Sequence, residues 1–509
     1  MRIIGPMNTA AGTLQDDACY LALKARDARF DGRFFIAVTS TGIYCRPVCK
    51  VRIPRRENCR FFSLAAQCES AGFRPCLRCR PELAPHSVTW SIQDASYILA
   101  HQAARLLDEP EAWGGDAPSV EQLAVRLGVS DRHVRRIFEA HFGVSPVQYL
   151  QTRRLLTAKQ LLADTDLPVT QVALVSGYAS VRRFNAAFAQ HYGLNPTQLR
   201  RHGASRSEHG VTVKLGYRPP YDVPAMLAFF RKRLIGGIEY VTDTGIGRTF
   251  SVDAGGKRHT GWLAAEFDPA RHQVVLRVSD SLREVLPLVI RRLRAALDLD
   301  ADPQAINAVL HDAFPQGDGL RVPGALSGYE LAVRAVLGQQ ITVAAARTLA
   351  QRMVDAFGDP IDTPLPELNR LFPHPAVLAQ ASGDALGQLG IVKQRQAAIV
   401  GIARAVADNR IQLHGGADVN ATIAALKELP GIGDWTAQYI AMRALRWPDA
   451  FPAGDVALQS ALGVRDARNP AREAEAASQA WKPWRSYAVI RAWSSMPAPA
   501  PKSTGAKTP

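Results

Sequence analysis

The chain has 509 residues, a formal net charge of +15 and a pI of about 9.7. One hydrophobic core rarely organises so long a chain, so we expect roughly three or four domains. No apolar run reaches the ~18 residues that a membrane span requires, and no signal segment opens the chain. These features exclude a membrane partner and favour nucleic acid as the partner. We expect a monomeric protein that is cytoplasmic and associated with the nucleoid.

The cysteines indicate a metal site near the start of the chain. All seven lie in the first 79 residues, and an odd, clustered set argues against a disulfide framework. Cys45-x3-Cys49 and Cys76-x2-Cys79 are two short thiolate pairs separated by a loop, which is the arrangement of a four-thiolate site for one Zn²⁺. A purely structural zinc site is the common use of such a set. Three further cysteines match no ligand position and are expected to be small core or surface residues: Cys19, Cys59 and Cys68.

The residues around these cysteines carry a resemblance. FFIAVTSTGIYCRPVCKVRIPRRENCRFF, followed by AAQCESAGFRPCLRCRPE, resembles the N-terminal domain of Ada methyl phosphotriester repair proteins over nearly all of residues 15–85. The resemblance implies that Cys45 accepts a methyl group from a methylated DNA phosphate, with the other three ligands completing the site. Four thiolates on Zn²⁺ sum to a charge of −2, and methylation of one leaves −1, so methylation is expected to raise affinity for DNA. The family's DNA contacts map onto Thr41, Lys50, Arg52 and Arg74, with Lys50 in place of a usual arginine.

Two helix-turn-helix patterns follow. SVEQLAVRLGVSDRHVRRIFEAHF has Ser119 as a helix cap and Gly128 at the turn, and PVTQVALVSGYASVRRFNAAFAQHY repeats the scheme with Gly177. The pair resembles an AraC-type DNA-binding domain, which implies promoter DNA and RNA polymerase as partners. The alternative is a helical bundle whose charges are merely solvated. The basic residues expected to contact DNA lie on the second helices: Arg132, Arg135, Arg136, Arg182 and Arg183.

The remainder of the chain contains a helix-hairpin-helix. Residues 211–297 indicate a small mixed sheet with helices, and the pattern then becomes almost wholly helical. In LKELPGIGDWTAQYIAMRAL (426–445) the L-P-G-x-G turn allows the backbone at Gly431 and Gly433 to approach a DNA phosphate. Alone, this motif predicts DNA binding and no more.

Residues 211–496 resemble AlkA-type 3-methyladenine DNA glycosylases throughout, including YRPPYD, VRAVLGQQIT (333–342) and WKPWRSYAVIRAW (481–493). The resemblance implies that Asp455, twenty residues after Trp435, is the catalytic carboxylate. Taken alone, Asp455 is more simply the N-cap of the helix VALQSALG, and any single aromatic residue is more simply a core residue. The residues implied to line the base pocket are Phe229, Trp435, Tyr439 and Trp493.

The chemistry expected of this pocket follows from the substrate. An N3- or N7-alkylated purine is positively charged and leaves readily, so a flipped base can stack on aromatic rings while the Asp455 carboxylate stabilises an oxocarbenium-like sugar. Enzymes of this type that also cleave the backbone carry a Schiff-base lysine where this chain has Trp435, so no lyase activity is expected. No cysteine follows position 79, which excludes the iron–sulfur cluster of related endonucleases.

The chain also departs from the best-known glycosylase. The residue that wedges into DNA is apolar there, whereas Gln340 stands at the matching position here, beside Ile341, and Val456 replaces a tyrosine. The family hairpin implies a possible monovalent cation held by the carbonyls of Lys427, Leu429 and Gly431.

Taken together, the sequence predicts a multidomain chain, mainly α with α+β parts: an Ada-like zinc domain (12–86), an AraC-type double helix-turn-helix (95–203), an AlkA-like mixed α/β-sheet domain (211–297), a helical helix-hairpin-helix glycosylase domain (298–496) and a disordered tail (497–509). The expected function is alkylation repair coupled to an adaptive response. Two alternatives stay open, namely a transcription regulator whose glycosylase-like half is inactive, and a constitutive glycosylase with a purely structural zinc domain.

Overall fold

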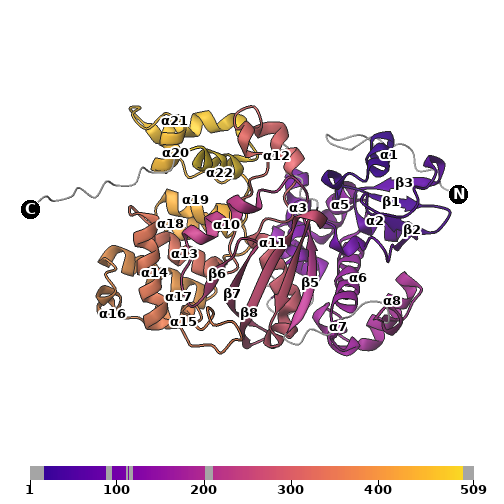
Figure 1. Cartoon of the computed structure of the whole chain (residues 1–509), viewed down its shortest axis with the longest axis horizontal. Helices are drawn as coiled ribbons and strands as arrows, with labels where there is room; N and C mark the ends of the chain where they lie inside the picture. The colour runs from indigo at the N-terminus through magenta and orange to yellow at the C-terminus, as the bar shows by residue number, and fades with distance from the viewer. Residues whose placement is uncertain (1–15, 87–94, 110–112, 114–117, 201–209, 497–509) are drawn as a thin grey trace, which may run out of the picture.

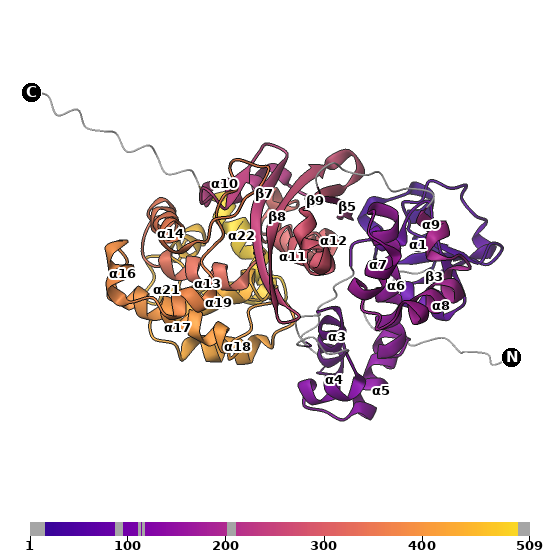
Figure 2. The same cartoon turned by 90° about the horizontal axis from the view of Figure 1, so that it is seen from below.

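A computed structural model describes residues 16–86, 95–109, 113, 118–200 and 210–496. The interval between the predicted domains that end at 203 and begin at 211, and the expected tail, fall largely or wholly outside these residues. The zinc-ligand and helix-turn-helix segments lie on one side of the molecule, the all-helical C-terminal segments lie on the other, and a sheet stands between them (Figures 1 and 2). Within the described part of the chain no helix is long and apolar enough to cross a membrane.

The cysteine-rich segment folds as a small α+β unit. Helix α1 (Asp16–Ala25) precedes a sheet of order β3-β1-β2-β4, in which β1 pairs antiparallel with β2 and β3, and β2 pairs parallel with β4. Helix α2 (Ala65–Ser70) covers the sheet, with Tyr44 and Cys68 fully buried between them. The strands are β1 (Phe35–Val38), β2 (Ile43–Cys45), β3 (Cys59–Phe62) and β4 (Arg74–Pro75).

The two predicted helix-turn-helix motifs are confirmed. The predicted cap Ser119 is in place, and Ser130 and Ser180 act in the same way: each of the three hydroxyls accepts from the backbone N–H three residues on. Gly128 ends α4 in the left-handed conformation with φ 67°. The helices are α3 (Ala95–Asp108), α4 (Val120–Leu127), α5 (Asp131–Phe142), α6 (Pro146–Asp164), α7 (Val169–Val175), α8 (Val181–Tyr192) and α9 (Pro196–Arg200).

The next unit is a five-stranded sheet of order β5-β9-β8-β7-β6. All four strand pairings are antiparallel, so the expectation of a mixed sheet is wrong for strand direction. Short turns join β6, β7, β8 and β9 in succession, and such short connections only suit antiparallel neighbours. The elements are β5 (Val211–Gly216), α10 (Val223–Lys232), β6 (Glu239–Val241), β7 (Gly245–Ala254), β8 (Lys257–Asp268), β9 (Gln273–Val278) and α11 (Leu286–Ala296).

The rest of the described chain is helical, as predicted. Helix α13 is buried almost all round, because α14, α17 and α19 pack about it in one large apolar core. The helix-hairpin-helix is formed by α18 and α19. The helices are α12 (Pro303–Leu310), α13 (Gly328–Leu337), α14 (Val343–Phe357), α15 (Pro375–Ala379), α16 (Gly383–Gln388), α17 (Lys393–Ala407), α18 (Val419–Lys427), α19 (Asp434–Arg443), α20 (Val456–Ala461), α21 (Pro470–Ala477) and α22 (Arg485–Ser495).

Candidate active site and metal centre

Asp455 lies at the N-terminus of α20 and is held by three donors. Its Oδ1 accepts from the backbone N–H of Leu458 at 2.7 Å and from the indole Nε1 of Trp493 at 3.0 Å. Its Oδ2 accepts from the indole Nε1 of Trp435 at 2.9 Å. The residue is therefore a helix cap, as its sequence context indicates, and also a carboxylate fixed among aromatic side chains. A cap needs only the first of these bonds.

The aromatic residues implied by the resemblance come together around this carboxylate. Trp435 and Tyr439 are one turn apart on α19 and stack with ring centroids 5.3 Å apart and planes at 16°. The Tyr439 and Trp493 rings are 6.3 Å apart at 41°. Together with Phe229 and Asp455 they line one cleft of about 1440 Å³. A cleft in which offset aromatic rings surround a fixed carboxylate suits a flat, electron-poor ring.

Two arginines at this cleft were not predicted. The Arg233 Cζ lies 3.6 Å from the Phe229 ring centroid, and the Arg443 Cζ lies 4.8 Å from it. Arg443 also donates to the Tyr439 hydroxyl. Burial raises the pKa of Tyr439, but the charges of Arg443 and Arg233 outweigh burial and leave this pKa below its usual range. Both arginines stand four residues after an aromatic residue on a helix, a spacing that could have revealed them.

The hairpin backbone is shaped as the glycine pattern predicts. Gly431 has φ 81°, and a Cβ there would lie 3.2 Å from the Gln394 carbonyl oxygen. The Gln339 side-chain amide donates to the Gly431 carbonyl at 2.9 Å, and the Leu429 carbonyl accepts from a backbone N–H at 3.1 Å. Two of the three carbonyls assigned to a monovalent cation are thus already hydrogen-bonded. Gly433 begins α19 without a side-chain cap, so the first N–H groups of α19 can face an anion.

The mouth of the cleft carries the two residues that depart from the best-known glycosylase. Gln340 is exposed and has φ 55°, a left-handed conformation that a residue with a side chain rarely adopts. Such strain clusters at ligand-binding positions. Val456 is 56% exposed, and both residues line the same cleft.

The four predicted ligands form one cluster in the zinc domain. The Sγ atoms of Cys45, Cys49, Cys76 and Cys79 all lie within 4.8 Å of one another, because the parallel pairing of β2 with β4 brings the two cysteine pairs together. Four sulfur donors at this separation fit a tetrahedral Zn²⁺ site. The backbone N–H of Arg46 points to the Cys79 Sγ at 3.4 Å.

The other three cysteines lie away from this cluster, within the described residues. Cys19, Cys59 and Cys68 are buried, as expected of small core residues. Burial raises the pKa of the Cys19 thiol to about 11, so this thiol stays protonated at neutral pH.

The predicted DNA-contacting residues differ in their surroundings. Thr41, Lys50 and Arg52 are exposed around the cysteine cluster. Arg74, in contrast, donates to the Tyr192 carbonyl at the end of α8, with N and O 3.2 Å apart. On the second helices of the two motifs Arg132, Arg136, Arg182 and Arg183 are exposed, while Arg135 is half-buried and pairs with Glu121 at 3.5 Å.

Four family models match consecutive parts of the chain: the metal binding domain of Ada over residues 18–82, a helix-turn-helix domain over 123–202, the AlkA N-terminal domain over 212–327, and the HhH-GPD superfamily of base excision DNA repair proteins over 333–486.

Three relatives show how these parts combine. DNA-3-methyladenine glycosylase 2 of Escherichia coli is 33% identical over 55% of this chain and 95% of its own. The bifunctional transcriptional activator/DNA repair enzyme Ada of the same organism is 32% identical over 38% of this chain and 51% of its own. A probable bifunctional transcriptional activator/DNA repair enzyme AlkA of Mycobacterium tuberculosis is 35% identical over 95% of this chain and 97% of its own. The chain therefore belongs to the family of bifunctional Ada/AlkA-type transcriptional activator/DNA repair enzymes.

Proposed function

We propose that this protein excises alkylated bases of the 3-methyladenine and 7-methylguanine type with its C-terminal half. Its N-terminal half transfers methyl groups from DNA methyl phosphotriesters to Cys45 and activates transcription at promoter DNA, with RNA polymerase as partner. The observation that carries the first activity is the Asp455 carboxylate, held by the indoles of Trp435 and Trp493 at the edge of the aromatic cleft.

The excision step follows from this geometry. A flipped, positively charged base stacks on the Trp435 and Tyr439 rings by cation–π attraction, worth about 0.5–2 kcal/mol. The C1′–N bond breaks with its electron pair passing to the base, and the Asp455 carboxylate stabilises the positive charge that develops on the sugar. A water oxygen then bonds to C1′ and releases a proton. Trp435 occupies the position at which a lysine would form a Schiff base, so the reaction ends with hydrolysis.

The orientation of Asp455 is suited to this role. An ionised carboxylate offers about four lone-pair positions, and the three donors around Asp455 occupy three of them. The free position can accept from the attacking water. The two indoles also hold the carboxylate without neutralising it, because an indole N–H is a neutral donor.

The methyl-transfer step uses the cysteine cluster. Bound Zn²⁺ would hold the four sulfurs as thiolates, the nucleophilic form. The Cys45 sulfur attacks the methyl carbon, the bond from carbon to phosphate oxygen breaks, and the repaired diester leaves with the electron pair. With Zn²⁺ bound, the net charge of the site would change from −2 to −1, which would weaken its repulsion of DNA phosphates and supply the activating switch.

Base release from methylated duplex DNA tests the glycosylase half. Asp455→Asn keeps the helix cap but removes the charge, so we expect single-turnover release of 3-methyladenine to fall by about a hundredfold or more. Asp418→Asn is the matched control, because Asp418 caps α18 through the Ala421 N–H at 2.8 Å and is not among the residues that line the aromatic cleft. Unchanged release by Asp455→Asn would overturn the mechanism. No release by the wild type would favour the regulator with an inactive glycosylase-like half.

A second assay tests the methyl-transfer half. Mass spectrometry after incubation with DNA carrying methyl phosphotriesters should find one methyl group on Cys45, and Cys59→Ser should be methylated equally. Absence of that group would favour a constitutive glycosylase with a structural zinc domain. Release measured across 3-methyladenine, 7-methylguanine, hypoxanthine and 1-methyladenine would define the substrate range.

A further inference from the structure

Arg218 is a fully buried residue at the contact between the zinc domain and the C-terminal half. Its exposed fraction is 0%, and its five N–H donors meet five backbone carbonyls. Three belong to the zinc domain: Asp31 at 2.7 Å, Pro85 at 3.1 Å and His86 at 2.8 Å. Two belong to the C-terminal half: Asp300 at 2.8 Å and Ala301 at 3.1 Å. One guanidinium therefore joins both halves.

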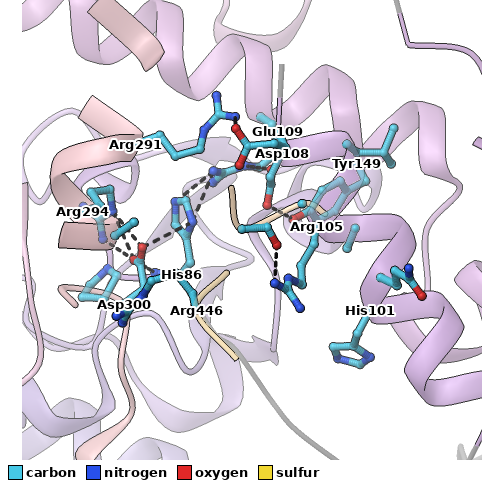
Figure 3. A pocket seen from close by; sticks show the side chains of 18 of the residues that line it. His86, His101, Arg105, Asp108, Glu109, Tyr149, Arg291, Arg294, Asp300 and Arg446 are labelled. Atoms are coloured by element: carbon cyan, nitrogen blue, oxygen red, sulfur yellow. Dashed lines mark hydrogen bonds and ion pairs between the residues drawn. The ribbon is translucent and has the colours of Figure 1, made fainter. Parts of the chain in front are cut away.

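The surrounding contact is close and polar. A Cβ on Gly216 would lie 2.4 Å from the Leu83 carbonyl oxygen, so β5 meets the zinc domain backbone to backbone. Figure 3 shows His86, Arg294 and Asp300 close together: the His86 backbone N–H donates to the Asp300 carboxylate at 2.8 Å, and Arg294 pairs with the same carboxylate. A contact held by this many buried hydrogen bonds allows little displacement of the zinc domain against the C-terminal half.

Arg218 is also linked to the base pocket through backbone bonds. Arg321 is 3% exposed and donates to the Arg218 carbonyl at 2.7 Å and to the Pro220 carbonyl at 2.8 Å. Two residues further on, the Pro323 carbonyl accepts from Arg443 at 2.7 Å, and Arg443 donates to the Tyr439 hydroxyl. The short segment 321–323 thus lies between Arg218 and the pocket arginine.

We propose that Arg218 is a positioning residue for base excision. Its guanidinium fixes the backbone of residues 218–220, whose carbonyls accept from Arg321, and this backbone places segment 321–323, then Arg443 and the Tyr439 ring on which the flipped base stacks. The inference rests on the proposed glycosylase function and adds that the zinc domain is part of the scaffold of the base pocket. Loss of the guanidinium leaves five carbonyls without its N–H donors, and the backbone of residues 218–220 is no longer fixed between the two halves. A small displacement of a stacking ring slows the chemical step more than it weakens DNA binding.

The test is Arg218→Met in the full-length, zinc-loaded chain. We expect single-turnover release of 7-methylguanine to be about tenfold slower, while the Kd for the same duplex changes by less than about twofold. Arg321→Met should slow release similarly, and the double variant should be no slower than either single variant, because both changes release one segment. The activity-independent readout is faster amide hydrogen exchange in α19 around Tyr439.

Arg153→Met is the matched control. Arg153 bonds His86 at 2.9 Å and Asp108 at 2.8 Å beside the same contact, but both partners belong to the N-terminal half. Release at the wild-type rate by Arg218→Met, or equal slowing by Arg153→Met, would overturn the inference. Arg218→Lys keeps the charge with fewer donors and should fall between wild type and Arg218→Met, which covers the case of a poorly folding Met variant. A wild type that releases no base would instead refute the proposed function.

Discussion

The two helix-turn-helix motifs share a sequence pattern but differ in how they are built into the molecule. The first motif packs its α4 and α5 with α3 in a separate apolar cluster, to which the zinc domain contributes Ala66. The second motif belongs to a larger cluster, in which Phe184 and Phe188 of α8 and Leu161 of α6 are continuous with the core of the five-stranded sheet. The second motif is therefore part of the fold of the C-terminal half.

The zinc domain contacts the two motifs in corresponding ways. The Gln67 side-chain amide donates to the Phe142 carbonyl at the end of α5, at 2.9 Å, and Arg74 donates to the Tyr192 carbonyl at the end of α8. Glu69 adds a second, buried contact between the zinc domain and the second motif. Equivalent helix ends are thus held by a neutral amide in one motif and by charged groups in the other, which predicts a firmer hold on the second motif.

The largest expected difference concerns the core phenylalanines. Phe138 and Phe188 are both fully buried, and replacing either by alanine should cost about 3–5 kcal/mol locally. Six of the eight tryptophans lie in residues 211–496, so tryptophan fluorescence reports mainly on the C-terminal half. In urea unfolding, Phe188→Ala should lower the fluorescence midpoint, and Phe138→Ala should change only hydrogen exchange of α3 to α5. Equal midpoints for both variants would contradict the difference between the motifs.

A pH effect is expected at the contact between the zinc domain and the second motif. Burial raises the pKa of Glu69 to about 7 despite hydrogen bonds from Thr152 at 2.7 Å and Tyr44 at 3.0 Å. His191 of α8 lies 3.7 Å away. The folded protein holds the proton on the Glu69 carboxyl more tightly than the unfolded chain does. The contribution of this proton to the free energy of unfolding is therefore fully present below about pH 4.5 and is lost as the pH rises to about 7.

The size of this effect is on the order of 3 kcal/mol. Glu69→Gln should remove the pH dependence of hydrogen exchange in α8 between pH 5 and 8 and leave α5 unchanged. A wild-type α8 that exchanges independently of pH, after correction for the intrinsic rate, would refute the assignment.

The sequence predicted those features that depend on residues close together in the chain. The serine caps, the turn glycines and the four cysteine ligands are each defined within a few residues, and the structure has all of them. The bonds from Trp435 and Trp493 to Asp455 span 20 and 38 residues. Neither could be derived from spacing, because they depend on how α19, α20 and α22 pack.

The contact between the two halves is the clearest case of what the sequence did not reveal. A polar run after Leu199 indicates a connection between domains, but carries no information on whether the flanking domains pack together. Arg218 stands in YRPPYD, where an arginine before two prolines suggests an exposed side chain. Its burial follows from five carbonyls contributed by three separate segments, which only the tertiary structure brings together.

A smaller effect is expected from Arg74, whose two possible roles can be separated. Arg74→Ala should destabilise the end of α8 by about 1–2 kcal/mol, seen as faster hydrogen exchange near Tyr192. If Arg74 remains on Tyr192 when DNA binds, the salt dependence of DNA affinity should be unchanged. If it moves to a phosphate, as the family resemblance implies, the slope of log K against log salt should fall by about one. Lys50→Ala, at an exposed predicted contact, serves as the comparison for a lost phosphate contact.

The smallest effect is expected from Gln67, which holds the first motif. Its bond to Phe142 is partly exposed and neutral, so Gln67→Ala should cost about 0.5–1 kcal/mol at the end of α5 and leave α8 unchanged. Gly143 ends α5 with φ 65°, and the position that a Cβ would take there faces the Gln67 side chain. Because the glycine itself adopts this conformation readily, the helix end keeps its shape when the Gln67 amide is removed. Hydrogen exchange at Phe142 and Gly143 measures the loss. An effect on α5 larger than that of Arg74→Ala on α8 would reverse the inferred order, and the first motif would then be the one that the zinc domain holds more firmly.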